Sequence, residues 1–169
     1  MTESIAASKA RFANFRAALY DCDRTELHRQ LETLFEPDCS VRLPYPIGDV
    51  SGSQGLFEAG YAPLLDAIPD LERRDYIVAG ALDRGENWVG CGGYYTGVFE
   101  AAWLGIPPTR HVITMRYIEF FRFDGDRIVE AKLLWDIPAL MMQAGAWPCL
   151  LYTSDAADEY NPVLVGGGG

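Results

Sequence analysis

Charged side chains gather on two segments toward the C-terminal end of the chain. Residues 127–136 alternate as a β-strand does, and one face carries Ile128, Glu130, Lys132, Leu134 and Asp136. The preceding predicted strand brings Arg116 and His111 opposite this segment. An arginine that faces a cavity polarises a substrate carbonyl or holds an enolate, so Arg116, with His111 near it, is a candidate catalytic group.

Each of these residues also has a structural interpretation. Asp136 directly precedes an apolar stripe with Pro138 in its first turn, so its carboxylate is suited to cap a helix by accepting the amide of Ala139. Arg116 is a surface residue if its strand is displaced by one position, because such a shift reverses the face. His111 is typical of an exposed strand end. The sequence leaves both interpretations open.

Aromatic residues on the predicted strands are candidate pocket walls. They are Trp88, Tyr94 and Trp103, with Lys132 as a charged neighbour. Aromatic rings on a packed sheet also serve simply as core. Glu119 and Glu130 are expected to pair with arginines on the sheet surface.

Hydrophobic periodicity predicts the elements that would position these side chains. Helices are predicted at 3–19, 24–35 and 53–67, strands at 39–43, 71–82, 88–99, 112–123 and 127–135, and a short helix at 137–144. Asp23 is expected to cap the second helix and Pro37 to end it, while Gly92 and Gly93 indicate a bulge or bend. Helices followed by long strands predict an α+β fold: a cone-shaped, curved antiparallel sheet packed against three N-terminal helices.

Composition narrows the classes of function. The formal charge of −10 over 169 residues argues against binding to nucleic acid or to anionic membranes. No apolar run reaches the length of a spanning helix and no signal peptide is evident, so a cytoplasmic location is expected. The scattered cysteines and only two histidines, His28 and His111, predict neither disulfides nor a metal site.

The last 21 residues are expected to lie outside the domain. Residues 149–159, CLLYTSDAADE, resemble the translation of a transposase adapter used in sequencing libraries, and glycines follow at 166–169. We therefore interpret 1–148 as one domain and 149–169 as an assembly artefact.

Several motifs carry a family resemblance. They are Ile68–Leu71 (IPDL), Gly93–Phe99 (GYYTGVF), Gly105–Thr109 (GIPPT), Phe121–Glu130 (FRFDGDRIVE) and the closing Asp136, Leu140, Gln143 and Gly145. Together they resemble the SnoaL-like polyketide cyclases, or ester cyclases, of the nuclear-transport-factor-2-like superfamily. The family often has Trp where this chain has Lys132.

The resemblance implies a function and a site. In such cyclases an aspartate at the position of Asp136 is the general acid/base of an intramolecular aldol closure, and no cofactor takes part. It also implies a homodimer through the exposed sheet face. The expected activity is that of a cyclase, or a related lyase or isomerase, on a small hydrophobic or carbonyl-bearing molecule.

Two alternatives stand beside this activity. A non-catalytic module of the same fold, binding a small ligand or a partner, is one, because a fold alone does not decide function. An epoxide hydrolase or ketosteroid-isomerase-like enzyme is the other. The hydrolases are associated with an Asp–Arg–Asp arrangement, for which Arg116 and Asp136 would supply two members.

Overall fold

The first third of the chain is mostly helical and the rest mostly sheet, as the periodicity predicts. The structure, a computed structural model, describes residues 5–147. Its helical elements are α1 (Ile5–Tyr20), α2 (Arg24–Leu34), α3 (Gly52–Leu56), the π-helical turn η1 (Phe57–Tyr61), α4 (Ala62–Ala67) and α5 (Ile137–Gln143). Its strands are β1 (Phe35–Arg42), β2 (Asp49–Ser51), β3 (Glu72–Asp83), β4 (Glu86–Val98), β5 (Val112–Asp124) and β6 (Arg127–Trp135).

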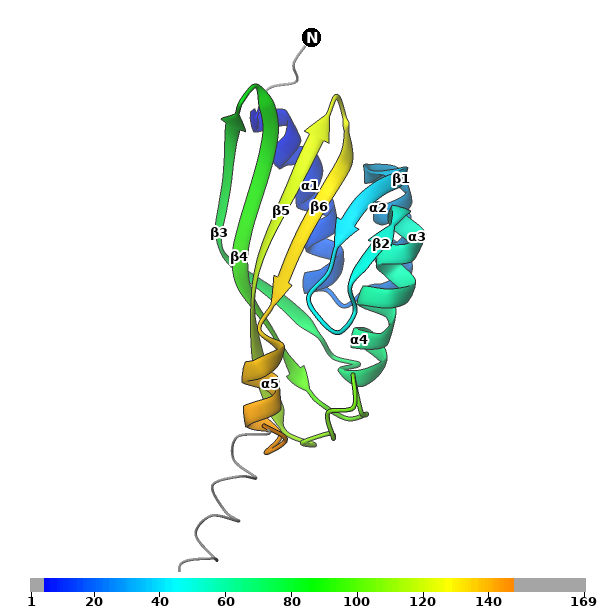
Figure 1. Ribbon diagram of the computed structural model, residues 1–169, viewed down its shortest axis with the longest axis vertical. Coiled ribbons are helices and arrows are strands. Elements are labelled where there is room, and N and C mark those ends of the chain that lie inside the picture. Colours follow the sequence, from blue (N-terminus) through cyan, green and yellow to red (C-terminus); the bar gives the residue numbers. More distant parts are fainter. Residues whose placement is uncertain (1–4, 148–169) are drawn as a thin grey trace, which may run out of the picture.

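The strands form one curved, open sheet in the order β2-β1-β6-β5-β4-β3. Figure 1 shows α1 behind the long strands, α2 and α3 beside β1 and β2, and α5 at the lower end of β5 and β6. Neighbouring strands are antiparallel except for β1 and β6, which run parallel. The predicted α+β fold is therefore confirmed, although the sheet is mixed rather than wholly antiparallel.

The second helix begins as predicted and ends earlier. The Asp23 carboxylate accepts a hydrogen bond from the Glu26 amide at 2.9 Å, which satisfies one of the free N–H groups at the start of α2. Phe35 is already extended and pairs with Ile128 of β6, so α2 stops at Leu34. Pro37 lies in β1, within a register shift where a missing N–H breaks no regular pairing, and it does not end the helix.

The predicted helix at 53–67 is interrupted by the wider turn η1. Its apolar stripe still faces the core, since Tyr61, Leu64, Leu65 and Ile68 are buried. Pro63 follows the turn and has no N–H to give to a carbonyl four residues earlier. A local π-turn accommodates this loss and keeps the stripe on one side.

Aromatic side chains fill the space between α1 and the sheet. Phe12 and Phe15 of α1 are fully buried, and the Phe12 ring centroid lies 4.5 Å from that of Phe121 on β5. Tyr61 packs at 5.6 Å from Trp135 of β6. Burying a side chain of this size stabilises a fold by about 1.5–3 kcal/mol, so this layer fixes α1 against β5 and η1 against β6.

Alternation on β5 and β6 decides which side chains face the helices. Met115 and Tyr117 are buried on the inner face of the sheet, whereas Arg116 between them points to the outer face. On β6 the residues Ala131, Leu133 and Trp135 face the core. Ile128, predicted on the opposite face, is also buried. A bulge causes this, because Ile128 pairs with Phe123 and Glu130 with Arg122, leaving Val129 unpaired.

The glycine pair on β4 lies opposite a bulge in β3. Asp75 pairs with Gly93 and Ile77 with Gly92, so Tyr76 is the extra residue. A Cβ atom at Gly93 would lie 2.1 Å from the Arg74 carbonyl oxygen. The predicted bulge or bend is therefore present, and Gly93 allows the close approach of β3.

Replacing Gly93 by alanine is expected to destabilise the fold by about 1–3 kcal/mol, because backbone must move to relieve the overlap. Gly92→Ala is the matched control: its Cβ would meet the Ile77 side chain at 3.2 Å, and that side chain is exposed. Urea unfolding of both variants measures the difference. Equal stabilities would show that Gly93 is not required by this approach.

Candidate active site

Arg116 and Asp136 come together on the outer face of the sheet. The Arg116 Nε and Nη2 atoms lie 3.0 and 2.7 Å from Asp136 Oδ2. The two residues are cross-strand neighbours, since the Asp136 amide donates to the Arg116 carbonyl at 2.8 Å. Arg116 is 73% exposed and Asp136 26% exposed, so the pair faces solvent. The structure thus places two of the three predicted catalytic residues side by side.

Asp136 also caps the following helix. Its Oδ1 atom accepts a hydrogen bond from the Ala139 amide at 3.1 Å, and Pro138 occupies the first turn of α5. One lone pair of Oδ1 remains free after this bond. The cap and a chemical role are therefore compatible, because the cap fixes the carboxylate while leaving it an acceptor site.

A groove of about 380 Å³ opens beside this pair. Tyr76, Ile118, Leu134 and Pro138 line it together with the pair, as do Tyr117 and Trp135, whose own side chains are buried in the core. Gly92 and Gly93 contribute no side chains to β4, the strand between Tyr76 and β5. The Tyr76 ring reaches over Gly92, where a Cβ would lie 3.6 Å from its hydroxyl. Gly92 therefore leaves room for Tyr76 to form one wall of the groove.

His111 and Trp103 lie away from the pair. His111 precedes β5 and is exposed, and it lies five residue steps before Arg116, about 17 Å along the extended chain. Trp103 is buried, with its ring centroid 6.2 Å from that of Trp135. Its indole N–H has no hydrogen-bond partner among residues 5–147. Trp103 therefore belongs to the packed interior and not to the lining of the groove.

Three other predicted residues lie on the outer face. Lys132 Nζ is 4.8 Å from the centre of the Trp88 ring and 3.0 Å from Glu130 Oε1. Glu130 also pairs with Arg122 at 3.1 Å, which agrees with the predicted surface ion pair. Tyr94 lines a second cavity at the edge of the sheet. Lys132 and Trp88 are absent from the linings of both cavities.

Glu119 is not on the sheet surface, contrary to prediction. It is fully buried, and its Oε2 atom lies 2.7 Å from Arg73 Nη1, whose side chain is also buried. The Tyr95 hydroxyl and the Trp135 indole N–H donate to Glu119 Oε1 at 3.0 and 2.9 Å. Burial opposes the charge of Arg73, but the Glu119 carboxylate outweighs it and raises the pKa of Arg73. Glu119 continues the inward register of Tyr117 and Phe121, which is the signal that sequence reasoning missed.

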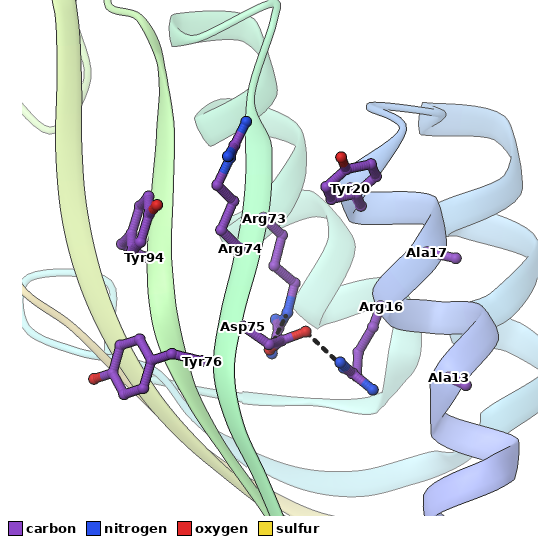
Figure 2. A pocket seen from close by; sticks show the side chains of 9 residues that line it. All are labelled: Ala13, Arg16, Ala17, Tyr20, Arg73, Arg74, Asp75, Tyr76 and Tyr94. Carbon is purple, nitrogen blue, oxygen red and sulfur yellow. Dashed lines mark hydrogen bonds and ion pairs between the residues drawn. The ribbon is translucent and has the colours of Figure 1, made fainter.

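Asp75 extends this network to the second cavity. Its Oδ1 atom accepts hydrogen bonds from the Tyr117 hydroxyl at 2.5 Å and from Arg73 Nε at 3.2 Å. Its Oδ2 atom accepts from Arg16 Nε at 2.6 Å, as Figure 2 shows. Burial opposes ionisation of Asp75, but the Arg73 charge and these hydrogen bonds outweigh it and lower its pKa.

The hydrolases are associated with an arginine between two acidic side chains, and Arg116 was the expected arginine. The structure has such an arrangement at Asp75, Arg73 and Glu119 instead. A carboxylate whose pKa is lowered is a weaker base, since proton transfer is most efficient when the pKa lies near the working pH. The Arg73 and Glu119 side chains have no exposed surface. The arrangement therefore suits holding a ligand at Asp75 better than activating water there.

A family model for SnoaL-like polyketide cyclases matches residues 7–144. That range contains the whole sheet, both cavities and Asp136. The chain belongs to the SnoaL-like polyketide cyclase family. No match was found among curated proteins.

Solved structures of SnoaL-like and related proteins share the fold. AclR of Streptomyces galilaeus, a candidate hydroxylase, aligns with a TM-score of 0.68 and 20% identity over 92% of this chain and 94% of its own. IdmH of Streptomyces antibioticus, a candidate polyketide cyclase, gives 0.67 and 21% over 82% and 98%. TsrD of Streptomyces laurentii gives 0.68 and 19% over 85% and 98%. The nuclear-transport-factor-2-like fold implied by the motifs is confirmed.

Lys132 of this SnoaL-like chain, where the resemblance led us to expect Trp, lies on β6. Its ammonium group lies beside the ring of Trp88, which belongs to β4, two strands away in the sheet. Within residues 5–147 no helix is long and apolar enough to cross a membrane, and no cluster of side chains is suited to hold a metal. The predicted artefact at 149–169 lies outside the described residues.

Proposed function

We propose that this SnoaL-like protein is an enzyme that performs acid/base chemistry on a small, largely apolar carbonyl compound, as a cyclase or a related lyase or isomerase. The observation that supports it is the Arg116–Asp136 pair at the edge of an apolar groove. Ligand sites commonly combine apolar walls with a few convergent polar groups. The groove fits that description.

The two side chains divide the work of an aldol-type reaction. The free lone pair of Asp136 Oδ1 removes a proton beside the substrate carbonyl and later returns one to the new alkoxide. Arg116 Nη1 has no partner among the described residues, so it is available to hold the carbonyl oxygen as it becomes an enolate. Neither step needs a cofactor.

The exposure of the pair favours this use. An exposed ion pair contributes only about 0–1 kcal/mol, because solvent screens it. Arg116 can therefore turn from the carboxylate toward a substrate oxygen at little cost. Asp136 meanwhile stays anchored through the Ala139 amide.

Filling the groove is expected to stop the reaction. Deuterium exchange into the acidic methylene of 2-tetralone, followed by NMR in D₂O, measures proton removal beside a carbonyl without knowledge of the natural substrate. Leu134→Trp puts an indole into the groove and is expected to slow the exchange at least about tenfold. Leu82→Trp, at an equally exposed position on β3 outside the groove, is expected to leave the rate unchanged.

Equal exchange by both variants would exclude the groove as the reaction site. Exchange by the unsubstituted protein no faster than in buffer would favour the second candidate, a non-catalytic ligand-binding module. A specific observation supports that candidate: the helix-covered face of the sheet is filled by Tyr61, Tyr95, Tyr117 and Trp135, and Asp136 does cap α5.

The predicted homodimer through the sheet face stays part of this proposal. Ile118, Phe120 and Leu134 are exposed apolar side chains on that face, and because Ile118 and Leu134 also line the groove, a partner chain there would lie against it. Apolar side chains that gather on one face are typical of an association surface.

A further inference from the structure

A second cavity, of about 580 Å³, lies between α1 and the edge strand β3 (Figure 2). Its nine lining residues are Ala13, Arg16, Ala17, Tyr20, Arg73, Arg74, Asp75, Tyr76 and Tyr94. Arg16 and Asp75 face each other across it from the two elements, joined by their hydrogen bond. The reaction proposed at Asp136 makes no use of this cavity.

Hydrogen-bonding capacity is left over at its centre. Asp75 Oδ2 accepts one bond, from Arg16 Nε, and a carboxylate oxygen has room for a second. The two terminal nitrogens of Arg16 have no partner among the described residues, although the side chain is only 27% exposed. A hydroxyl group placed there donates to Asp75 Oδ2 and accepts from Arg16 at the same time. That combination matches a hydroxyl and not a carboxylate, which has no hydrogen to donate.

The charges around the cavity also favour a neutral group. Arg16 pairs with Asp75, Arg74 pairs with Glu72 at 2.8 Å, and Arg73 is held by Asp75 and Glu119. Each positive charge therefore has an acidic neighbour. An anion brought to Asp75 Oδ2 would meet a carboxylate that is already negative, since the Arg73 charge and then the hydrogen bonds lower the pKa of Asp75.

The remaining walls suit an aromatic ring. Tyr20 brings a phenol ring from α1, while Tyr76 and Tyr94 project from the other face of β3 and β4 and lie at the outer rim of the cavity (Figure 2). Ala13 and Ala17 lie one turn apart on α1 and leave space beside Arg16. Aromatic walls favour aromatic ligands through offset or edge-to-face contacts.

We infer that the cavity between α1 and β3 binds a small neutral hydroxyaromatic compound, its hydroxyl donating to Asp75 Oδ2 and accepting from Arg16. This site is separate from the Asp136 groove, although Tyr76 lines both. Ligand binding at this site can therefore be tested independently of the reaction proposed at Asp136.

A matched pair of fluorescent probes tests the inference: 7-hydroxycoumarin, and 7-methoxycoumarin, which has no hydroxyl to donate. The hydroxyl probe is expected to bind at least about tenfold more tightly. Its affinity is expected to fall as the pH rises through its own pKa, because the phenolate cannot donate to Asp75. Fluorescence titration of the full chain measures both effects. Equal affinity of the two probes, or tighter binding of the phenolate, would overturn the inference.

Variants locate the bound probe. Arg16→Gln is expected to weaken binding of 7-hydroxycoumarin about tenfold, and Ala17→Trp to abolish it by filling the cavity. Asn14→Trp, an equally exposed position on α1 that does not line the cavity, and Asp136→Asn are expected to leave the affinity unchanged. Binding that Asp136→Asn removes and Arg16→Gln spares would move the probe to the groove and contradict the inference.

Discussion

Asp136→Asn is expected to slow deuterium exchange into 2-tetralone by about 10²–10⁴-fold, the usual contribution of a positioned general base. Asparagine keeps an oxygen that can accept the Ala139 amide, so the cap of α5 is retained while the base is removed. The melting temperature is therefore expected to stay within about 2 °C of the unsubstituted protein.

Two further variants separate the cap from the chemistry. Asp136→Ala removes both the helix cap and the base. We expect it to lose the exchange activity and to lower the free energy of unfolding by about 1 kcal/mol. Arg116→Gln keeps the carboxylate and is expected to give an intermediate rate, because only the oxyanion partner is lost. Full exchange by Asp136→Asn would end the assignment of Asp136 as the base.

Glu119→Leu is expected to destabilise the fold by about 3–5 kcal/mol, more than the other substitutions proposed for this protein. The substitution leaves the Arg73 charge buried without its main partner at 2.7 Å. It also removes the acceptor of the Tyr95 hydroxyl and the Trp135 indole N–H. Urea unfolding measures the loss, which corresponds to a fall in melting temperature on the order of 10 °C.

The double variant Arg73→Met with Glu119→Leu is the control. Apolar side chains in place of a buried ion pair are often tolerated, because no charge is left in the core. We expect this variant to recover about half of the loss, since Asp75 keeps its bonds from Tyr117 and Arg16. A double variant less stable than Glu119→Leu alone would show that Arg73 stabilises the core by another route.

The family, the order of elements and the cap at Asp136 follow from local patterns in the sequence. The approach of Arg116 to Asp136 depends on strand register. The turn after Asp124 sets this register by pairing Asp124 with Arg127, and further along the hairpin Tyr117 lies opposite Trp135. The bulge at Val129 leaves no trace in the pattern, because Ile128 and Val129 are both apolar.

The buried network could not be predicted because its members are distant in sequence. Residues 72–75, ERRD, look like an exposed charged run, and nothing local distinguishes Arg73 from Arg74. Arg73 finds its partner 46 residues later, at Glu119. The cavity beside Asp75 depends in addition on how α1 packs against β3, and no local pattern in the sequence indicates this packing.

A crystal structure of the protein soaked with 2-tetralone tests the central claim most directly. The account predicts the ketone in the groove, with its acidic methylene carbon about 3–3.5 Å from Asp136 Oδ1 and its oxygen within hydrogen-bond distance of Arg116. A ketone bound only in the cavity of Figure 2, or an Asp136 whose free oxygen site faces away from the bound ketone, would contradict it.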